Sequence, residues 1–272
     1  MIKVFVDSGS SIKQDEKELY NVDIIPLKVL LNGKEYLDGL DLTMDVFYDE
    51  LINNNQFPKT SLPDLGELED KVKKYVDEGH DVIILTISSG ISGTYNAMNL
   101  LFQDEPKVHI VDSETACGGM KILVREINKY GNESIEFILE KLGKLIPRIR
   151  VYAVPETLAY LHKGGRLSKL GYTAATLFRI KPVIELRKTV SVSDKTLGIK
   201  KAMNEIVAKL ENCDINYPIV PSYTYKPDNL NELISRTSEK YKEIMIEFDD
   251  IDPAIAAHWG PNACGYIFVE KE

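Results

Sequence analysis

The stretch from residue 81 to residue 102 constrains the fold of this chain most strongly. It begins with the apolar run DVIILTI, continues through the short loop SSGISG, and ends in TYNAMNLLF, whose apolar residues recur at helical spacing. An apolar run without alternation is typical of a parallel strand covered on both faces. A parallel strand followed at once by a helix is the repeating unit of α/β proteins, so the stretch predicts a parallel sheet with helices on both faces.

The rest of the chain extends this prediction to two domains. Residues 2–6 (IKVFV) and 107–112 (KVHIVD) read as further buried strands, whereas KPVIEL and TVSVS, later in the chain, resemble a hairpin in a mixed sheet. At roughly 150 residues per domain, a length of 272 residues suits two medium domains or one large α/β unit, and the change of pattern near residue 148 favours two domains. We therefore expect an α/β fold with a three-layer α/β/α parallel-sheet domain over residues 1–147 and a two-layer α/β mixed-sheet domain over residues 148–272.

The charge of the chain excludes one broad class of function. Lys and Arg total 33, and Asp and Glu total 42, which gives a formal net charge of −9. A surface of that charge repels a phosphate backbone, so nucleic acid is not an expected partner. Apolar stretches are far shorter than the roughly 18 residues that span a bilayer, and the N-terminus lacks a signal-peptide pattern. The sequence predicts a cytoplasmic protein without stable membrane insertion.

The cysteines and most of the histidines form no metal-ligand pattern. The cysteines are odd in number and widely spaced, which fits neither a disulfide framework nor a zinc site, so we expect them to be reduced and buried. Three histidines show no ligand spacing with one another or with the cysteines. The residues concerned are Cys117, Cys213, Cys264, His80, His109 and His162. We expect no metal and no cofactor.

The loop SSGISG carries hydroxyl groups at the point where a helix begins. Ser92 lies just before that helix, and the free N–H groups of a helix N-terminus attract anions. The loop lacks the lysine of a phosphate loop and the glycine spacing of a dinucleotide fingerprint. A nucleophile elbow would need glycine at position 94, where Thr94 stands. The residues alone leave an anion site and a plain helix cap equally open.

A second pair of hydroxyl groups, on Thr60 and Ser61, precedes another helical segment. Pro63 stands where a first-turn proline belongs, so Ser61 or a neighbour is expected to cap this helix. Taken alone, such a pair is more often a cap than a site. Because α/β proteins gather ligands at one edge of the sheet, Thr60 and Ser61 could share one anion with the Ser92 loop.

Three further segments carry groups that can bind a ligand. His258 stands in AHWGPNACG, which reads as a Gly/Pro loop between two apolar strands, and it is either a ligand-binding or a buried structural histidine. Arg166 ends the turn KGGR, whose cations suit a carboxylate, a phosphate or a docking contact, although a solvated turn looks the same. Asp7 follows the first strand and either binds a ligand or caps a turn.

In their order along the chain, these segments resemble successive blocks of the bacterial DegV-like family. The blocks are VDSGSSI, TSLPD, SSGISGTY, VDSETACGG, LHKGGRLS, IKPVIEL and AHWGPNACG, and they cover nearly the whole chain. The resemblance implies a two-domain α/β protein that binds one long-chain fatty acid and is not itself an enzyme. It further implies that the protein is the fatty-acid-binding subunit of a bacterial fatty acid kinase, in which a separate ATP-dependent subunit phosphorylates the acid.

The same resemblance assigns roles to individual residues. It implies that Thr60 and Ser92 hydrogen-bond the carboxylate of the acid, beside Ser61, and that His258 completes this network. The acyl chain would then lie in the first domain, and the second domain would close the head-group site.

Partner contacts and departures from the family pattern follow in the same way. Arg166 would tune the carboxylate network or the approach of the kinase. Lys195 and Thr196 stand where family members often carry an Arg-Thr pair for docking on the kinase, and lysine keeps the charge but not the bidentate geometry of arginine. Three other positions depart from the family pattern: Gly9, Asp64 and Trp259.

Two other functions remain open from the residues alone. A serine hydrolase or acyltransferase would use Ser92 as the nucleophile and His258 as the base, although no carboxylate that would orient the histidine is evident. A phosphate- or nucleotide-binding regulator would use the Gly/Ser loops, although no element for recognising adenine or ribose is apparent.

Overall fold

The chain folds into two compact units. The structure, a computed structural model, describes residues 2–54, 56–168, 180–246 and 248–272. Unit 1 comprises Met1–Pro147 together with Asp252–Ala254, and unit 2 comprises Arg148–Ile251 and Ile255–Glu272. Three residues near the end of the chain therefore belong with the first unit.

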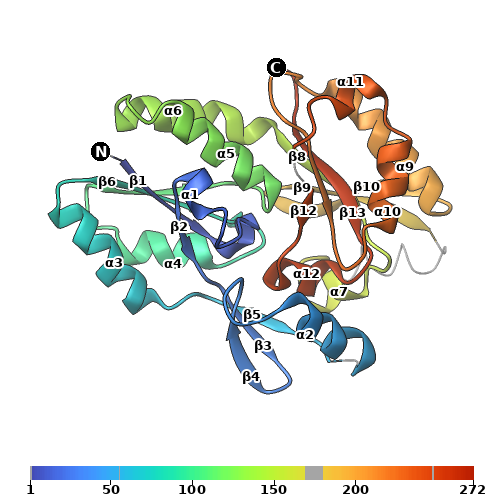
Figure 1. The fold of residues 1–272 in the computed structure, drawn as a ribbon, viewed down its shortest axis with the longest axis horizontal. Helices are drawn as coiled ribbons and strands as arrows, with labels where there is room; N and C mark the ends of the chain where they lie inside the picture. Colours follow the sequence, from blue (N-terminus) through green and yellow to red (C-terminus); the bar gives the residue numbers. More distant parts are fainter. Residues whose placement is uncertain (1, 55, 169–179, 247) are drawn as a thin grey trace. The chain divides into compact units, whose positions relative to one another are not determined.

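Unit 1 is built around a parallel sheet (Figure 1). Its elements are β1 (Ile2–Asp7), α1 (Lys17–Tyr20), β2 (Asp23–Ile25), β3 (Lys28–Leu31), β4 (Lys34–Leu37), α2 (Met44–Tyr48), β5 (Lys59–Ser61), α3 (Leu65–Asp77), β6 (Asp81–Thr86), α4 (Thr94–Leu101), β7 (Val108–Asp112), α5 (Gly118–Lys129) and α6 (Ile135–Leu145). The four strands run in the order β2-β1-β6-β7, and every neighbouring pair is parallel. Helices α5 and α6 cover one face, and α3 and α4 cover the other. The predicted three-layer domain is confirmed.

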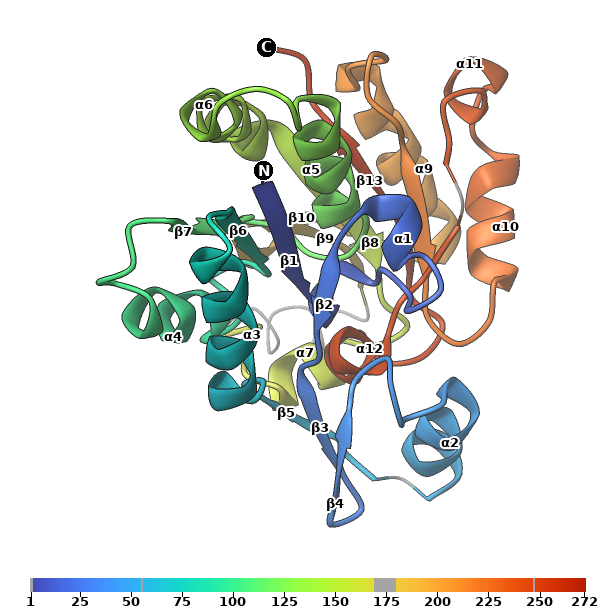
Figure 2. The same cartoon turned by 60° about the vertical axis from the view of Figure 1, so that its left-hand side comes forward.

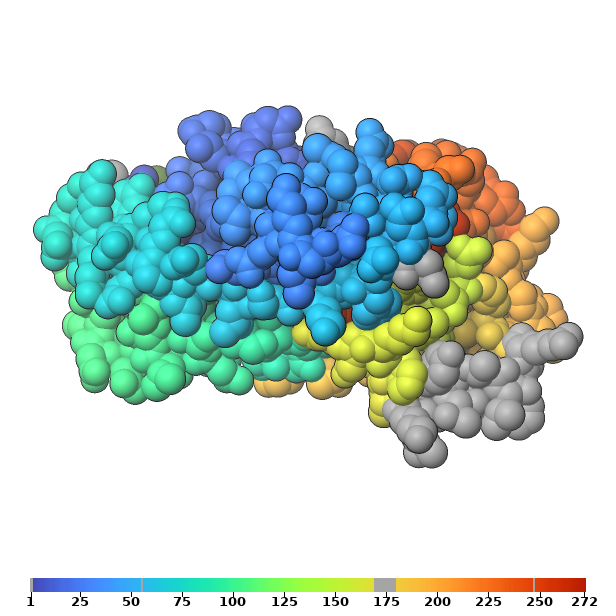
Figure 3. Space-filling view, turned by 90° about the horizontal axis from the view of Figure 1, so that it is seen from below, coloured from blue at the N-terminus to red at the C-terminus, as the bar shows by residue number. Residues whose placement is uncertain are grey.

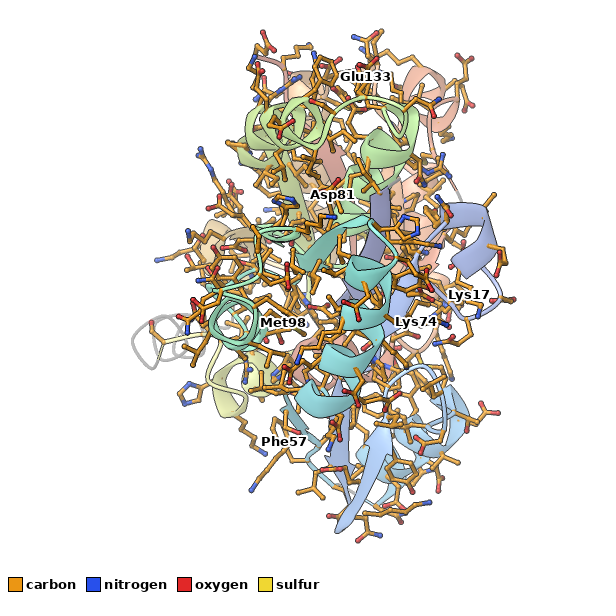
Figure 4. The ribbon with its side chains drawn as sticks, turned by 90° about the vertical axis from the view of Figure 1, so that its left-hand side faces the viewer. Lys17, Phe57, Lys74, Asp81, Met98 and Glu133 are labelled. Atoms are coloured by element: carbon orange, nitrogen blue, oxygen red, sulfur yellow. The ribbon has the colours of Figure 1, made fainter. Side chains whose placement is uncertain are left out.

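The strands of this sheet are apolar throughout because helices pack on both faces. Phe5 and Ile84 belong to the buried cluster on the side of α3 and α4, to which α3 contributes Leu68 and Val72. Met98 of α4 joins the same cluster and lies against α3 (Figure 4). The absence of alternation in the strand sequences is therefore a direct consequence of the layered fold.

A smaller antiparallel sheet follows the second parallel strand. Its strands run in the order β4-β3-β5. Asn32 and Gly33 connect β3 to β4 with φ angles of 50° and 77°, as a two-residue hairpin turn of this hand requires. On the face of unit 1 drawn in Figure 3, the residues around β3 and β4 lie beside those of α3.

Unit 2 contains a mixed six-stranded sheet. Its elements are β8 (Ile149–Val154), α7 (Ala159–Lys163), β9 (Lys181–Arg187), β10 (Thr189–Thr196), α9 (Ile199–Lys209), β11 (Val220–Tyr223), α10 (Asp228–Ser235), α11 (Glu239–Lys242), β12 (Asp249–Asp250), α12 (Pro253–Trp259, its first two residues counted with unit 1) and β13 (Cys264–Val269). The strand order is β10-β9-β8-β13-β11-β12, and only the pair β11 and β12 is parallel. Helices α9 and α10 lie side by side on this sheet (Figure 2). The predicted two-layer mixed-sheet domain and its β9–β10 hairpin are confirmed.

Two general properties of the described part of the chain bear on function. Cys117, Cys213 and Cys264 are buried, as predicted. Within the described ranges, no helix combines the length and the apolar character needed to cross a bilayer.

Candidate functional site

Buried polar side chains gather at the carboxyl ends of the parallel strands of unit 1. They follow β1, β6 and β7 and comprise Asp7, Ser8, Ser10, Ser11, Thr86, Ser88, Ser113 and Thr115. The chain leaves β1 toward β2 on one side of the sheet, whereas β6 and β7 lie on the other side. Open parallel sheets bind ligands at such a reversal, outside the carboxyl ends of the strands. The edge between β1 and β6 is therefore the candidate site of unit 1.

Asp7 connects the two loops at this reversal. Its Oδ1 accepts a hydrogen bond from the N–H of Gly9 at 3.0 Å, and its Oδ2 accepts one from the N–H of Ile87 at 2.8 Å. The carboxyl group is fully buried, and burial raises its pKa to about 7 against the opposing effect of the two N–H groups. A Cβ on Gly9 would lie 2.8 Å from Asp7 Oδ1. Gly9, one of the departures from the family pattern, thus makes room for this carboxyl group.

Ser92 lies in the loop between β6 and α4, where the sequence places it. Its hydroxyl is 2.9 Å from that of Thr94 and accepts a hydrogen bond from the N–H of Thr94 at 3.3 Å. Its own N–H donates to the carbonyl of Ser88 at 3.1 Å. Ser92 is half-buried, and α4 begins two residues later. The loop therefore holds a hydroxyl group beside the N-terminus of an eight-residue helix.

The geometry gives no support to a nucleophilic role for Ser92. A nucleophile elbow holds its serine in a strained turn between strand and helix, but Ser92 is not among the described non-glycine residues with positive φ. Its hydroxyl contacts that of Thr94, which is not a base. The hydrolase alternative is not supported.

Thr60 and Ser61 lie in a strand, so the predicted helix cap is wrong. Both belong to β5, in which Thr60 pairs with Val29 of β3. The cap of α3 is Asp64, whose carboxylate accepts a hydrogen bond from the N–H of Glu67 at 3.0 Å. The physical reason is that pairing with β3 keeps residues 59–61 extended, and Asp64 rather than Ser61 supplies the cap oxygen.

The structure brings the two hydroxyl segments of unit 1 next to each other. A Cβ on Gly93 would lie 3.8 Å from Cδ2 of Leu62. Leu62 directly follows Ser61, and Gly93 directly follows Ser92. Leu62 therefore lies close to Gly93, and the hydroxyl pair that precedes Leu62 stands in a strand rather than in a helix cap.

A cavity of about 220 Å³ lies in unit 1 beside these segments. Its apolar lining comes from β1, β2, β4, α3 and the connections β2–β3 and β5–α3, and includes Phe5, Ile25, Pro26, Leu37, Pro63 and Leu68. Lys71 and Lys74 of α3 are among its charged lining residues, and Figure 4 labels Lys74. Pro63, which lies two residues after Ser61 in the sequence, is the lining residue nearest along the chain to that hydroxyl segment.

His258 lies in a helix, so the predicted loop between two strands is wrong at this point. It occupies the last turn of α12, which begins at Pro253 and ends just before Gly260 with a φ of 72°. Proline at the first helical position and a left-handed glycine just past the last are ordinary helix limits. The N–H of Gly260 donates to the carbonyl of Ala256 at 2.8 Å and closes the helix.

Within unit 2, the KGGR turn packs against His258. A Cβ on Gly164 would lie 2.2 Å from Nδ1 of the imidazole, so only glycine permits this approach. Arg166 donates to the carbonyl of Gly164 at 2.5 Å. Burial, followed by the positive charge of Arg166, lowers the pKa of His258 to about 3. The imidazole is therefore neutral at physiological pH and stands beside a cation.

The predicted docking pair separates into one exposed and one buried residue. Lys195 is exposed on β10, whereas Thr196 is buried and its hydroxyl donates to the carbonyl of Lys181 at 2.7 Å. Of the two, only Lys195 presents its side chain to solvent.

One buried carboxyl pair of unit 1, Asp38 and Asp252, is missed by the sequence reasoning. Both side chains are buried, and both have raised pKa values, mainly because of burial. Asp38 precedes Gly39 just after the end of β4, and an Asp-Gly pair at such a position is typical of an exposed turn. The local sequence contains no signal that brings these two residues together.

Comparison with known proteins agrees with this architecture. Residues 1–271 match the profile of a family described as "Uncharacterised protein, DegV family". A DegV domain-containing protein of Clostridium acetobutylicum is 30% identical over 283 residues, with 99% of each chain covered. The solved fatty acid binding DegV family protein of Streptococcus agalactiae is 26% identical with a TM-score of 0.90, over 100% of this chain and 99% of that chain. A stearic acid-binding protein of Eubacterium ventriosum is also 26% identical, with a TM-score of 0.85 and the same coverage.

The match extends over both units, and the order of the motifs agrees with it. The chain therefore belongs to the DegV family.

Proposed function

We propose that this protein binds one long-chain fatty acid and presents its carboxylate to a separate, ATP-dependent fatty acid kinase in the cytoplasm. In this proposal, unit 1 holds the acyl chain and the protein performs no chemistry of its own. The observation that carries the proposal is the cavity of unit 1, which has apolar and charged lining residues and is lined by Pro63, two residues after Ser61. The solved relatives named as fatty acid binding proteins support it.

The energetics of such a ligand match the division between cavity and hydroxyl groups. Burying about 16 carbons gains on the order of 10 kcal/mol, whereas removing the carboxylate from water is costly unless it finds hydrogen bonds. Thr60, Ser61 and Ser92 supply donors, and the N-terminus of α4 supplies positive potential. The flexible side chain of Met98 lies in the adjoining core and can move aside for a chain longer than the cavity.

Residues of unit 2 add to the recognition of the head group in this proposal. The neutral imidazole of His258 can donate one N–H to a carboxylate, and Arg166 next to it favours a bound anion. Lys195, exposed on β10, is proposed as a contact for the kinase.

The binding part of the proposal is tested by extracting the purified protein with organic solvent and identifying lipids by mass spectrometry. Added oleate is expected to bind. Ser92→Ala and His258→Ala are each expected to raise the dissociation constant about tenfold, because each removes a hydrogen bond to a charged group. Ser235→Ala, a change of an exposed serine on α10, is the control and should bind like the unmodified protein. A protein that yields no lipid and binds no added fatty acid would refute the proposal.

The kinase part is tested separately with the loaded protein, ATP and a bacterial fatty acid kinase. The γ-phosphoryl group of ATP is expected to pass to a carboxylate oxygen, which gives acyl phosphate and ADP. Neither protein alone should form the product. Lys195→Glu is expected to lower the rate and to leave the affinity for the fatty acid unchanged.

A further inference from the structure

Two buried carboxyl groups of unit 1 hold the start of α12. Oδ1 of Asp38 accepts a hydrogen bond from the N–H of Ala254, 216 positions away, at 2.9 Å. Asp252 forms an ion pair with Lys13. We call these four residues, Lys13, Asp38, Asp252 and Ala254, the clasp. All four belong to unit 1.

The backbone around Asp38 fixes the direction of its side chain. The N–H of Asp38 donates to the carbonyl of Leu27 at 2.8 Å, and the N–H groups of Leu40 and Asp41 donate to the carbonyl of Leu37. Gly39 supplies the left-handed conformation with a φ of 74°. The Asp38 side chain is fully buried as a result, and its Oδ2 has no hydrogen-bond partner within the described part of the chain.

The N–H of Ala254 needs an acceptor from outside its own helix. The first N–H groups of a helix have no intrahelical partner, and a proline at the first position has no N–H group at all. Ala254 is the residue after Pro253 and is buried, so its N–H cannot turn to water. Asp38 supplies the missing acceptor and thereby fixes the first turn of α12. His258 lies one turn further along the same helix.

The charges around the clasp are unbalanced. Burial, and then the charge of Asp252, raise the pKa of Asp38 to about 7. The hydrogen bonds with Ser8 and Ala254 and the charge of Lys13 act in the opposite direction and lower this pKa. Burial also raises the pKa of Asp252, which Lys13 and Lys121 oppose and Glu16 reinforces. The groups that face the two carboxyl groups are Ser8, Lys13, Glu16, Lys121 and the N–H of Ala254. When both carboxyl groups are ionised, two buried negative charges stand together.

We propose that Asp38 is a positioning residue for the fatty acid site, because its hydrogen bond to Ala254 fixes the first turn of the helix that carries His258. This inference rests on the proposed function only for the ligand, since the clasp itself is independent of it. Protonation of Asp38 keeps the clasp closed. Ionisation places its charge next to Asp252 and favours release of the first turn of α12.

The sign of the pH effect follows from the raised pKa. The closed clasp is most stable below the ordinary pKa of an aspartate, near 3.8. Its stability decreases as the pH rises toward 7, because opening then releases the proton of Asp38, and it levels off above pH 7, where the closed form has lost this proton as well. Between pH 5 and pH 7 the opening constant should increase about tenfold per pH unit.

The test of the clasp itself is hydrogen exchange of the Ala254 amide, measured by NMR without fatty acid. Asp38→Asn keeps an acceptor oxygen but cannot ionise. The exchange rate of the unmodified protein, divided by that of Asp38→Asn, is expected to rise about 100-fold from pH 5 to pH 7. Asp41→Asn changes an exposed carboxyl group in the same turn and should behave like the unmodified protein. A ratio that does not change with pH would overturn the clasp.

The test of positioning is the affinity for oleate at pH 5.5 and pH 7.5. Asp38→Leu removes the acceptor and is expected to raise the dissociation constant about tenfold, whereas Asp41→Asn should leave it unchanged. If Asp38→Leu does not fold, Asp38→Asn provides the test instead. This variant should lose the part of the pH dependence of the oleate dissociation constant that is due to ionisation of Asp38. Faster exchange of Ala254 with unchanged affinity would overturn the positioning role. If the unmodified protein binds no fatty acid, the proposed function fails, and the exchange experiment still tests the clasp.

Discussion

Asp7 and Asp38 are both fully buried in unit 1, and burial raises the pKa of each to about 7. Their hydrogen bonds differ. Asp7 accepts backbone N–H groups on both oxygens, from two loops at the carboxyl edge of one sheet. Asp38 accepts one N–H on one oxygen, from a distant segment, and has a second acid as its neighbour. Equal burial therefore produces two different devices: one fixes local loops, and the other holds a distant helix.

The largest expected effect is the loss of stability when either aspartate is replaced by alanine. The two losses differ because the replacements leave different numbers of backbone N–H groups without an acceptor. A buried N–H without a partner costs about 1–3 kcal/mol. Asp7→Ala strands two such groups and should lower the free energy of unfolding by about 4 kcal/mol, and Asp38→Ala, which strands one, by about 2 kcal/mol. Urea unfolding at pH 3.5 measures both losses, because below the ordinary aspartate pKa of 3.8 neither carboxyl group has to take up a proton on folding. Equal losses would contradict the distinction.

The space around Asp7 gives the next effect. Gly9→Ala places a Cβ 2.8 Å from Asp7 Oδ1 and 3.2 Å from Cβ of Ile87, and overpacking of this kind costs about 2 kcal/mol. Gly143→Ala in α6 meets nothing within 4 Å and should stabilise the protein by about 0.5–1 kcal/mol. Thermal unfolding of the two variants should therefore shift in opposite directions.

The pH dependence of stability sharpens the comparison. Each raised pKa contributes stability that is present below about 3.8 and is lost as the pH rises to about 7. Between pH 5 and pH 7, the unmodified protein should lose about 1 kcal/mol per pH unit relative to Asp38→Asn. Asp7→Asn should flatten the curve as well, but at the cost of stability at every pH, because its amide N–H₂ group must face one of the two N–H donors. Denaturant midpoints across this range measure both slopes.

The smallest effect comes from an exposed carboxyl group with the opposite behaviour. A hydrogen bond from the N–H of Glu67 lowers the pKa of Asp64, the cap of α3. The stability that it contributes is present above the ordinary aspartate pKa and is lost as the pH falls below it. Asp64→Ala should shift the urea midpoint slightly at pH 7 and not at pH 2.5. A large shift at both values would show that the cap acts through packing rather than charge.

The sequence predicts those parts of the fold that have local causes. The strand and helix around the Ser92 loop are evident because an unbroken apolar run and a helical repeat stand side by side. The run from Pro253 to Gly260 carries ordinary helix limits, but it is short and rich in small residues, so it reads as a loop.

The errors at the candidate site have non-local causes. Thr60 and Ser61 form a strand only because β3 pairs with them, and a three-residue strand has no period of its own. The residues Asp38 and Ala254 are 216 positions apart, so the local sequence around either of them does not predict their contact.

Because Asp252–Ala254 belongs to unit 1, the order of synthesis matters for folding. Residues 1–147 leave the ribosome first, and the chain from 148 to 251 must follow before the clasp can close. At bacterial elongation rates of about 5–20 residues per second, this interval is roughly 5–20 s. During that time the nascent unit 1 contains Asp38 without its partner, so its folding is complete only after Ala254 has been synthesised.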